Sequence, residues 1–177
     1  MGSEDDCKTN QRKPRFLCLH GFRKSAAILK KLIFEKWPTQ VEFTEYQNFD
    51  KCLAYIEECM IKHGPFSGLL GFSQGAILSG ALCGLQDKGV ALTKVPKIKY
   101  LIIIGGAKLQ NKQMAEKAYS SPITCPSLHF LGTFCSYNYW NHVLIHHPNG
   151  HIIPRFDEKG QESMLSFIEK MQAEINK

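Results

Sequence analysis

The chain has 177 residues, a length that suits one domain with a sizeable hydrophobic core. Its composition, 44% hydrophobic and 21% charged, is that of an ordinary globular protein. The net charge of +6 is not gathered into a basic run, which argues against a nucleic-acid partner. The strongest apolar stretch, around residues 100–104, is too short to cross a bilayer, so no membrane partner is expected.

Cysteine usage and the N-terminus predict the compartment. The seven cysteines show no CxxC spacing, which argues against a zinc site or a disulfide framework and favours a reducing environment. Residues 1–13 are polar and charged, which predicts a disordered segment. They also lack the apolar core of a secretory signal. We therefore expect an intracellular protein with a single folded domain over residues 14–177.

The first part of the chain alternates short apolar runs with helical patterns. Arg15–Leu19 predicts a buried strand, and apolar residues at helical spacing predict a helix from Ser25 to Trp37. Residues 41–43 could form a further short strand. A second helix is expected after Asn48, whose side chain can cap it, and before Gly64. Its apolar stripe consists of Phe49, Leu53, Ile56 and Met60.

The rest of the chain repeats this alternation with more apolar strands. Strands are expected at 66–70, at 99–104 (closed by Gly105–Gly106), at 127–131 and at 142–145, and helices at 73–85 and 157–175. Strands that alternate with helices and are apolar along their whole length are typical of a parallel sheet covered on both faces. The sequence therefore predicts an α/β fold.

One pentapeptide carries a chemical signal. Residues 71–75, Gly-Phe-Ser-Gln-Gly, match G-x-S-x-G and lie between an apolar strand and an apolar helix. That context is the nucleophile elbow, a turn so tight that the flanking residues Gly71 and Gly75 must lack side chains. The hydroxyl of Ser73 would then project at the carboxyl edge of the sheet, beside the positive end of the helix dipole. We interpret Ser73 as a catalytic nucleophile.

A serine hydroxyl needs a base to take its proton. In hydrolases of this fold the histidine follows the last strand, and His151 lies there, after the turn at residues 148–150. A histidine beyond the carboxyl end of a strand can reach a serine at the end of a neighbouring strand. His146 and His147 are rival candidates that lie nearer the strand itself.

The reaction also requires donors for the developing oxyanion. One should be the backbone N–H of Gln74, which follows the nucleophile. The other should come from the loop after the first strand, where Gly21 permits a close approach and the N–H of Phe22 is the candidate. His20 could hold this loop by hydrogen bonding.

These motifs together resemble the family of serine hydrolases that includes the ovarian-cancer-associated hydrolase and fungal thioesterases, with the plant members most similar. The resemblance covers most of the chain from Arg12 onward. It implies an α/β-hydrolase fold and action on small-molecule esters or thioesters without metal, cofactor or a specific protein partner. It also implies a location in the cytoplasm, with the nucleus as a second site. The matching segments are residues 17–23, 71–76, 125–132 and 147–151.

Two departures from that family bear on activity. In the family a triad aspartate lies three residues after the glycine that corresponds to Gly132, and here Cys135 stands at that position. The loop around it is also shortened. Between Trp37 and Glu42 relatives carry another strand, of which only residues 38–41 remain, so the sheet is expected to lack a strand relative to the family.

The triad acid can also be sought without the family. In the chain order Ser, acid, His, the acid must fall between Ser73 and His151, and that interval holds only Asp87 and Glu116. Asp87 ends the helix that Ser73 begins, so at about 1.5 Å rise per residue it lies roughly 20 Å away and is excluded. Glu116, in a predicted helix, is a weak candidate. Asn138 or Asn141 could orient the histidine as neutral substitutes.

Two functions follow from these patterns. The first is a serine hydrolase that cleaves esters or thioesters through an acyl-serine intermediate. The second is a catalytically impaired pseudohydrolase or a truncated isoform, because no triad acid is identifiable. Loss of the triad acid lowers kcat by about 10⁴ in a serine protease, so a slow esterase remains compatible with the sequence.

Overall fold

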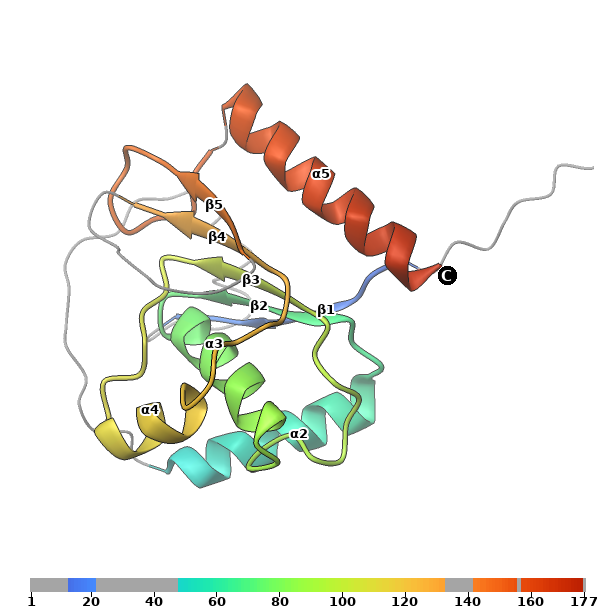
Figure 1. Ribbon diagram of the computed structural model, residues 1–177, viewed down its shortest axis with the longest axis vertical. Helices are drawn as coiled ribbons and strands as arrows, with labels where there is room; N and C mark the ends of the chain where they lie inside the picture. Colours follow the sequence, from blue (N-terminus) through green and yellow to red (C-terminus); the bar gives the residue numbers. More distant parts are fainter. Residues whose placement is uncertain (1–12, 22–47, 133–141, 156, 177) are drawn as a thin grey trace, which may run out of the picture.

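A computed structural model of the chain describes residues 13–21, 48–132, 142–155 and 157–176 (Figure 1). Five strands form one sheet in the order β1-β2-β3-β4-β5, and all four neighbouring pairs are parallel. The predicted parallel sheet is confirmed. The strands are β1 (Phe16–Leu19), β2 (Gly68–Phe72), β3 (Tyr100–Ile104), β4 (Ser127–Leu131) and β5 (His142–His146).

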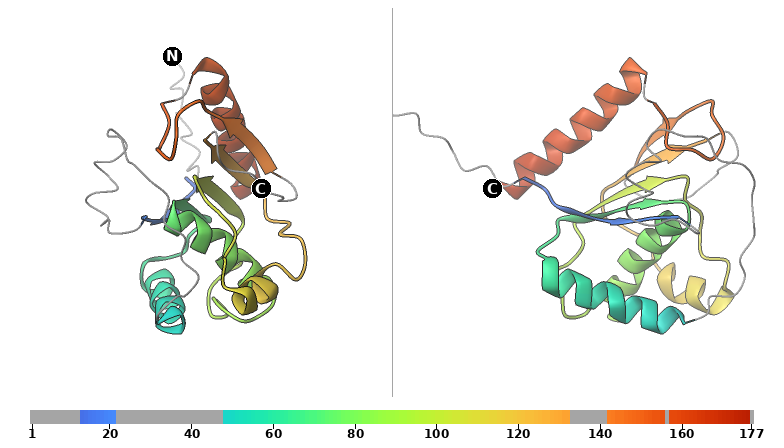
Figure 2. Two further views of the ribbon diagram at one scale, coloured as in Figure 1. Left: turned by 90° about the vertical axis from the view of Figure 1, so that its left-hand side faces the viewer. Right: turned by 180° about the vertical axis from the view of Figure 1, so that it is seen from behind.

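Helices cover both faces of the sheet, as predicted (Figures 1 and 2). The helices α2 (Phe49–His63), α3 (Gln74–Asp87) and α4 (Lys112–Ala118) share one face, and α5 (Glu158–Ile175) lies on the other. The first three connect strands that follow one another across the sheet. Since parallel crossovers are right-handed, such connections place their helices on the same side.

The core is therefore divided by the sheet into two clusters. β3 shows the division most clearly, because all five of its residues are buried. Leu101 and Ile103 belong to the cluster under α2, α3 and α4, whereas Tyr100, Ile102 and Ile104 belong to the cluster under α5. Successive side chains of a strand point to opposite faces, so a strand covered on both sides must be apolar throughout.

The boundaries of β2 and α3 differ from the expected ones. β2 does not break at Gly71, because Gly71 and Phe72 continue the strand and pair with Ile103 and Ile104 of β3. The pairing with β3, which the local sequence does not specify, sets this register. Ser73 is the N-cap residue of α3 rather than its first helical residue. Ser73 consequently lies directly between the last residue of β2 and the first residue of α3.

α2 is confirmed with its apolar stripe, but the expected cap is wrong. Leu53, Ile56 and Met60 are buried against the sheet. Asn48 occupies the N-cap position with φ 55°, and its side chain makes no capping hydrogen bond. A capping side chain reaches the first turn from an extended backbone, and the left-handed backbone of Asn48 directs it elsewhere. Burial of the stripe stabilises this helix without that bond.

α5 is held by its own cap and by a contact with β3. The Asp157 carboxylate accepts a hydrogen bond from the N–H of Gly160, which caps the first turn. Near the other end of the helix, the Tyr100 hydroxyl donates a hydrogen bond to the Glu174 carboxylate. Burial and this neighbouring carboxylate both raise the pKa of Tyr100. The first contact stabilises the start of α5, and the second attaches the helix to β3.

Several expectations fall on residues outside the described ranges. They are the segment 1–12, the helix at 25–37, the strand at 41–43 and the strand missing between Trp37 and Glu42. Of the helices that the structure describes, none combines the length and apolar character needed to cross a membrane. Among the same residues, no three His, Cys, Asp or Glu side chains gather where they could share a metal ion.

A buried polar cluster lies between β4 and β5. His129 is fully buried, one of its ring nitrogens lies 2.9 Å from the Ser127 hydroxyl, and its ring meets that of His142 edge-on at 5.7 Å. Burial, and secondly the electrostatic effect of the neighbouring His142, lowers the pKa of His129 from 6.5 to about 4. The folded protein therefore holds this imidazole in its neutral form.

This cluster predicts an acid-sensitive fold. The unfolded chain binds a proton at His129 near pH 6.5, and the folded chain does so only near pH 4. The free energy of unfolding should therefore fall as the pH drops from about 6.5 to 4, by roughly 3 kcal/mol from this group. Urea unfolding at several pH values measures this slope.

His129→Gln removes the titrating group and should flatten the slope over that interval. His63→Gln, at an exposed position on α2, is the matched control and should leave the slope as it is. Parallel curves for the parent and His129→Gln would contradict the assignment.

Candidate active site

The site is built at the carboxyl edge of the sheet, where β2 passes into α3. Ser73 stands between them with φ 57° and ψ −118°, a conformation that residues with a side chain rarely adopt. Its backbone N–H donates a 3.0 Å hydrogen bond to the carbonyl of Ile104 at the end of β3. Its carbonyl accepts from the N–H groups of Ala76 and Ile77 in the first helical turn. The neighbouring strand and the helix together hold this strained turn.

Close approach of backbones explains the two glycines of the turn. A Cβ on Gly71 would lie 2.3 Å from the carbonyl oxygen of Gly75 and 2.5 Å from the backbone of Ala76. A Cβ on Gly75 would lie 2.0 Å from the carbonyl oxygen of Leu19 in β1. Neither backbone neighbour can move without separating α3 from the sheet. The structure therefore places both glycines where the elbow requires them.

The structure brings His151 to Ser73. The Nε2 atom of His151 lies 2.8 Å from the Oγ atom of Ser73, although 78 residues separate them along the chain. Burial lowers the pKa of His151 below its ordinary 6.5, so the imidazole is neutral at pH 7. A neutral ring can accept the serine proton at Nε2, and this is the arrangement that general-base catalysis requires.

The loop that carries His151 is anchored to β4. The N–H of His147 donates a 3.0 Å hydrogen bond to the carbonyl of Leu131, which extends the ladder between β4 and β5. Gly132 lies against the following turn, since a Cβ there would be 2.8 Å from the carbonyl oxygens of Asn149 and Gly150. These contacts fix the start of the loop and direct His151 toward β2.

The rival histidines are placed differently. His146 ends β5 and is exposed, whereas His147 is buried beyond it, where burial lowers its pKa. Of these three histidines, only His151 is hydrogen-bonded to the Ser73 side chain.

One of the two expected oxyanion donors can be located. Gln74 is the first residue of α3, so its N–H is one of the groups that a helix leaves without an internal partner. Phe22 lies outside the described residues, but the preceding Gly21 is close, because a Cβ there would be 3.0 Å from the Cβ of Ser73. His20 is exposed, and its Nδ1 donates a 2.9 Å hydrogen bond to the carbonyl of Gly21, as a loop-holding role requires.

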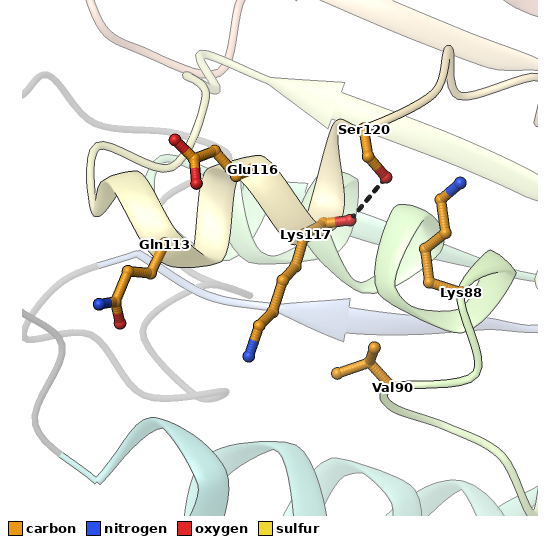
Figure 3. Close-up of a pocket in the computed structure, with 6 residues that line it drawn as sticks. All are labelled: Lys88, Val90, Gln113, Glu116, Lys117 and Ser120. Carbon is orange, nitrogen blue, oxygen red and sulfur yellow. Dashed lines mark hydrogen bonds between the residues drawn. The ribbon is translucent and has the colours of Figure 1, made fainter.

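The structure does not bring the candidate acid Glu116 to this site. Glu116 is exposed on α4 and lines a surface depression with Lys88 and Val90, which follow the far end of α3 (Figure 3). The reason is the packing of α4, whose Ala118 carbonyl lies where a Cβ of Gly84 would be, deep along α3. No carboxylate among the described residues contributes to the pKa of His151.

Of the other residues considered for the position of the acid, only Asp87 belongs to the described part of the chain. Asp87 ends α3, the helix that Ser73 begins, and pairs with Lys97 at 2.8 Å. Cys135, Asn138 and Asn141 all lie outside the described residues. The residues that precede them do reach the site, because Gly132 touches the turn before His151.

Two residues at the site escaped sequence reasoning. The ring of Phe72 stacks on the imidazole of His151, with centroids 5.3 Å apart and planes inclined by 23°. Gly105, with φ 56°, lies under one edge of the same imidazole, and a Cβ there would be 2.9 Å from Nδ1. In the sequence, Phe72 directly precedes Ser73 and Gly105 directly follows a strongly apolar strand. These positions at strand ends are the only sequence signal that could have indicated the two residues.

The close approach at Gly75 yields a prediction. Gly75→Ala should lower the free energy of unfolding by roughly 3 kcal/mol or more, because the added methyl group meets backbone atoms of β1 that cannot rotate away. Urea unfolding measures the effect. Gly150→Ala is the control, since a Cβ at Gly150 meets nothing within 4 Å. Equal unfolding midpoints for the two variants would refute the steric account.

Comparison with known proteins identifies the family of the chain. Residues 31–163 match the family model described as Serine hydrolase (FSH1). The chain is 26% identical to rhodanese-like domain-containing protein 6 of Arabidopsis thaliana, over 74% of this chain and 32% of that protein. It is 28% identical to esterase OVCA2 of Bos taurus, over 73% of this chain and 60% of that protein.

A solved structure shows the same fold. Acyl-protein thioesterase 2 of Zea mays superposes with a TM-score of 0.61 at 13% identity, covering 93% of this chain and 96% of that one. The chain therefore has the α/β-hydrolase fold. It spans about a third to three fifths of the length of the two curated relatives above. Because the family model matches more than half of the chain, the chain belongs to the FSH1 family of serine hydrolases.

Proposed function

We propose that this chain is a serine hydrolase that cleaves carboxylic esters or thioesters of small molecules through an acyl-serine intermediate. The observation that carries the proposal is the 2.8 Å contact between Nε2 of His151 and Oγ of Ser73 at a nucleophile elbow. Membership of a serine hydrolase family supports the same reaction class.

In the first half of the reaction, the Ser73 oxygen attacks the carbonyl carbon of the substrate. His151 takes the serine proton at Nε2 as the new carbon–oxygen bond forms, and the carbonyl oxygen becomes an oxyanion. The imidazolium then gives that proton to the departing alcohol or thiol as the bond to the leaving group breaks. The products of this half are the free leaving group and an ester of Ser73.

Donors for the oxyanion come from the backbone. The N–H of Gln74 points out of the first turn of α3, where the helix dipole also favours negative charge. We assign the second donor to the N–H of Phe22, on the grounds that Gly21 lies against Ser73. In the second half, water enters where the leaving group stood, and its oxygen attacks the acyl carbon while His151 takes its proton. His151 then returns this proton to the Ser73 oxygen as the bond between that oxygen and the acyl carbon breaks, which releases the acid and restores Ser73.

Support for esters and thioesters is chemical as well as comparative. Alkoxides and thiolates leave a tetrahedral intermediate more readily than amines do, so such substrates demand least of a histidine without an identified acid partner. The relatives point the same way, since one is named an esterase and the structural neighbour a thioesterase.

Covalent labelling tests the nucleophile. A fluorophosphonate probe should modify Ser73 in the parent protein, and intact-mass measurement followed by peptide mapping should locate the adduct there. Ser73→Ala should not be labelled. Glu116→Gln should be labelled at the parental rate, because that residue lies with Lys88 and Val90 near the far end of α3. Equal labelling of the parent and Ser73→Ala, or of neither, would remove Ser73 from the mechanism.

Two specific observations favour a second function, that of a catalytically impaired pseudohydrolase. Residues 133–141, which follow the point where β4 reaches the site, contain no Asp or Glu. The connection from β4 to β5 also has only ten residues, 132–141, whereas parallel strands need about a dozen or more. Shortening of this segment would remove the acid while leaving Ser73 and His151 in place.

Restoring the acid separates the two functions. Cys135→Asp should raise kcat for a p-nitrophenyl ester by up to about 10⁴, because the acid orients the base and stabilises the imidazolium. Cys135→Asn has nearly the same shape without the charge and should give a much smaller gain. Equal and low kcat for both variants, with cooperative unfolding retained, would show that position 135 does not reach His151 and would rule out simple loss of the acid there.

A further inference from the structure

We propose that Phe72 and Gly105 are positioning residues that hold the imidazole of His151 against Ser73, in place of the carboxylate of an ordinary triad. The inference rests on the proposed function, since it concerns the base of that same reaction. It goes beyond that function by assigning an orienting role to one aromatic face and one backbone edge.

Three contacts surround the His151 ring. Nε2 meets Ser73, one face stacks on Phe72 at 5.3 Å, and the edge formed by Nδ1 and Cε1 lies over Gly105. Among the described residues, no hydrogen-bond partner of Nδ1 is found. Within the described part of the chain, an aromatic side chain and a stretch of backbone thus make the contacts that limit tilt and rotation of the ring.

The residues that make these two contacts, Phe72 and Gly105, are held rigidly. Phe72 is 7% exposed in the cluster under α5, and as the last residue of β2 it precedes the nucleophile directly. The N–H of Gly105 donates a 3.0 Å hydrogen bond to the carbonyl of Phe130 in β4. Both surfaces therefore belong to strand ends rather than to a free loop.

The Phe72 ring also attracts the imidazole once His151 is protonated. When His151 takes the serine proton, the ring becomes a cation, and an aromatic face within about 6 Å attracts a cation. The contact at 5.3 Å meets that condition. The usual free energy of such a cation–π interaction corresponds to a factor of about 2 to 30 in rate. A triad acid contributes far more, a factor of about 10⁴. Phe72 can orient the base and partly stabilise its charge, but it cannot restore the activity of a full triad.

Gly105 contributes space rather than charge. Its positive φ is a conformation that side chains disfavour, and a Cβ there would collide with the imidazole at 2.9 Å. Any other residue at position 105 would therefore displace the ring from Ser73. A displacement of about 1 Å at a reacting group lowers a rate on the order of 100-fold.

Phe72 is tested against a residue with the same burial. Phe72→Leu should lower kcat for p-nitrophenyl butyrate by about 2- to 30-fold with KM unchanged, because the stack touches the base and not the substrate. Phe72→Tyr keeps the ring and should restore parental kcat. Phe167→Leu, 7% exposed in the same cluster but in edge-on contact with Tyr100, should leave kcat unchanged. Equal kcat for Phe72→Leu and Phe167→Leu would overturn the role of Phe72.

A proton NMR signature gives a readout besides activity. The His151 ring protons should be shifted upfield by the Phe72 ring current in the parent, Phe72→Tyr and Phe167→Leu, and not in Phe72→Leu. The absence of this shift in the parent would overturn the stacking contact. If the parent shows the shift but no labelling of Ser73, the proposed function fails, and the catalytic role of Phe72 fails with it.

Gly105 has its own matched control in Gly89. Both glycines have positive φ, 56° and 66°, but a Cβ on Gly89 meets nothing within 4 Å. Ala at either position carries similar backbone strain, so a difference between the two variants reports the contact with His151. Gly105→Ala should slow fluorophosphonate labelling about 100-fold, and Gly89→Ala should leave it unchanged. Equal labelling rates would overturn the role of Gly105.

Discussion

The structure depends on one close approach, that of the first turn of α3 to the ends of β1 and β2. Gly75 lies so near the Leu19 carbonyl, and Gly71 so near the Gly75 carbonyl, that neither position has room for a side chain. The approach forces Ser73 into a backbone conformation that costs about 1 to 3 kcal/mol, and the Ile104 carbonyl and the first helical turn hold it there. Without it, the serine oxygen would not stand clear of the sheet at the start of a helix.

The parallel sheet brings the other residues of the site to Ser73. Because all five strands run the same way, their carboxyl ends meet at one edge, and residues remote in sequence converge there. Ser73 follows β2, Gly105 follows β3, Gly132 follows β4, and His151 lies in the loop after β5. The hydrogen bond between Ser73 and His151 is thus a consequence of strand order.

The protonation and orientation of His151, the proposed base, are maintained by burial and by two contacts among the described residues. Burial lowers the pKa of His151 and keeps it neutral, and Phe72 and Gly105 confine its ring. Neither contact supplies the negative charge with which a carboxylate stabilises the imidazolium. Under the proposed function, the described residues hold the nucleophile and the base but bring no carboxylate to the imidazole, and residues 133–141 contain no Asp or Glu.

Sequence alone determined the elements whose signals are local. The apolar runs predicted β3 and β4, the G-x-S-x-G pentapeptide between a strand and a helix predicted the elbow, and the helical stripe predicted α2. Tertiary structure decided what depends on neighbours remote along the chain. It set the register of β2 through its pairing with β3, replaced the Asn48 cap by burial, and placed Glu116 away from His151. It also brought Phe72 and Gly105 against the imidazole, because contacts between strand ends follow from the order of strands in the sheet, which no local pattern encodes.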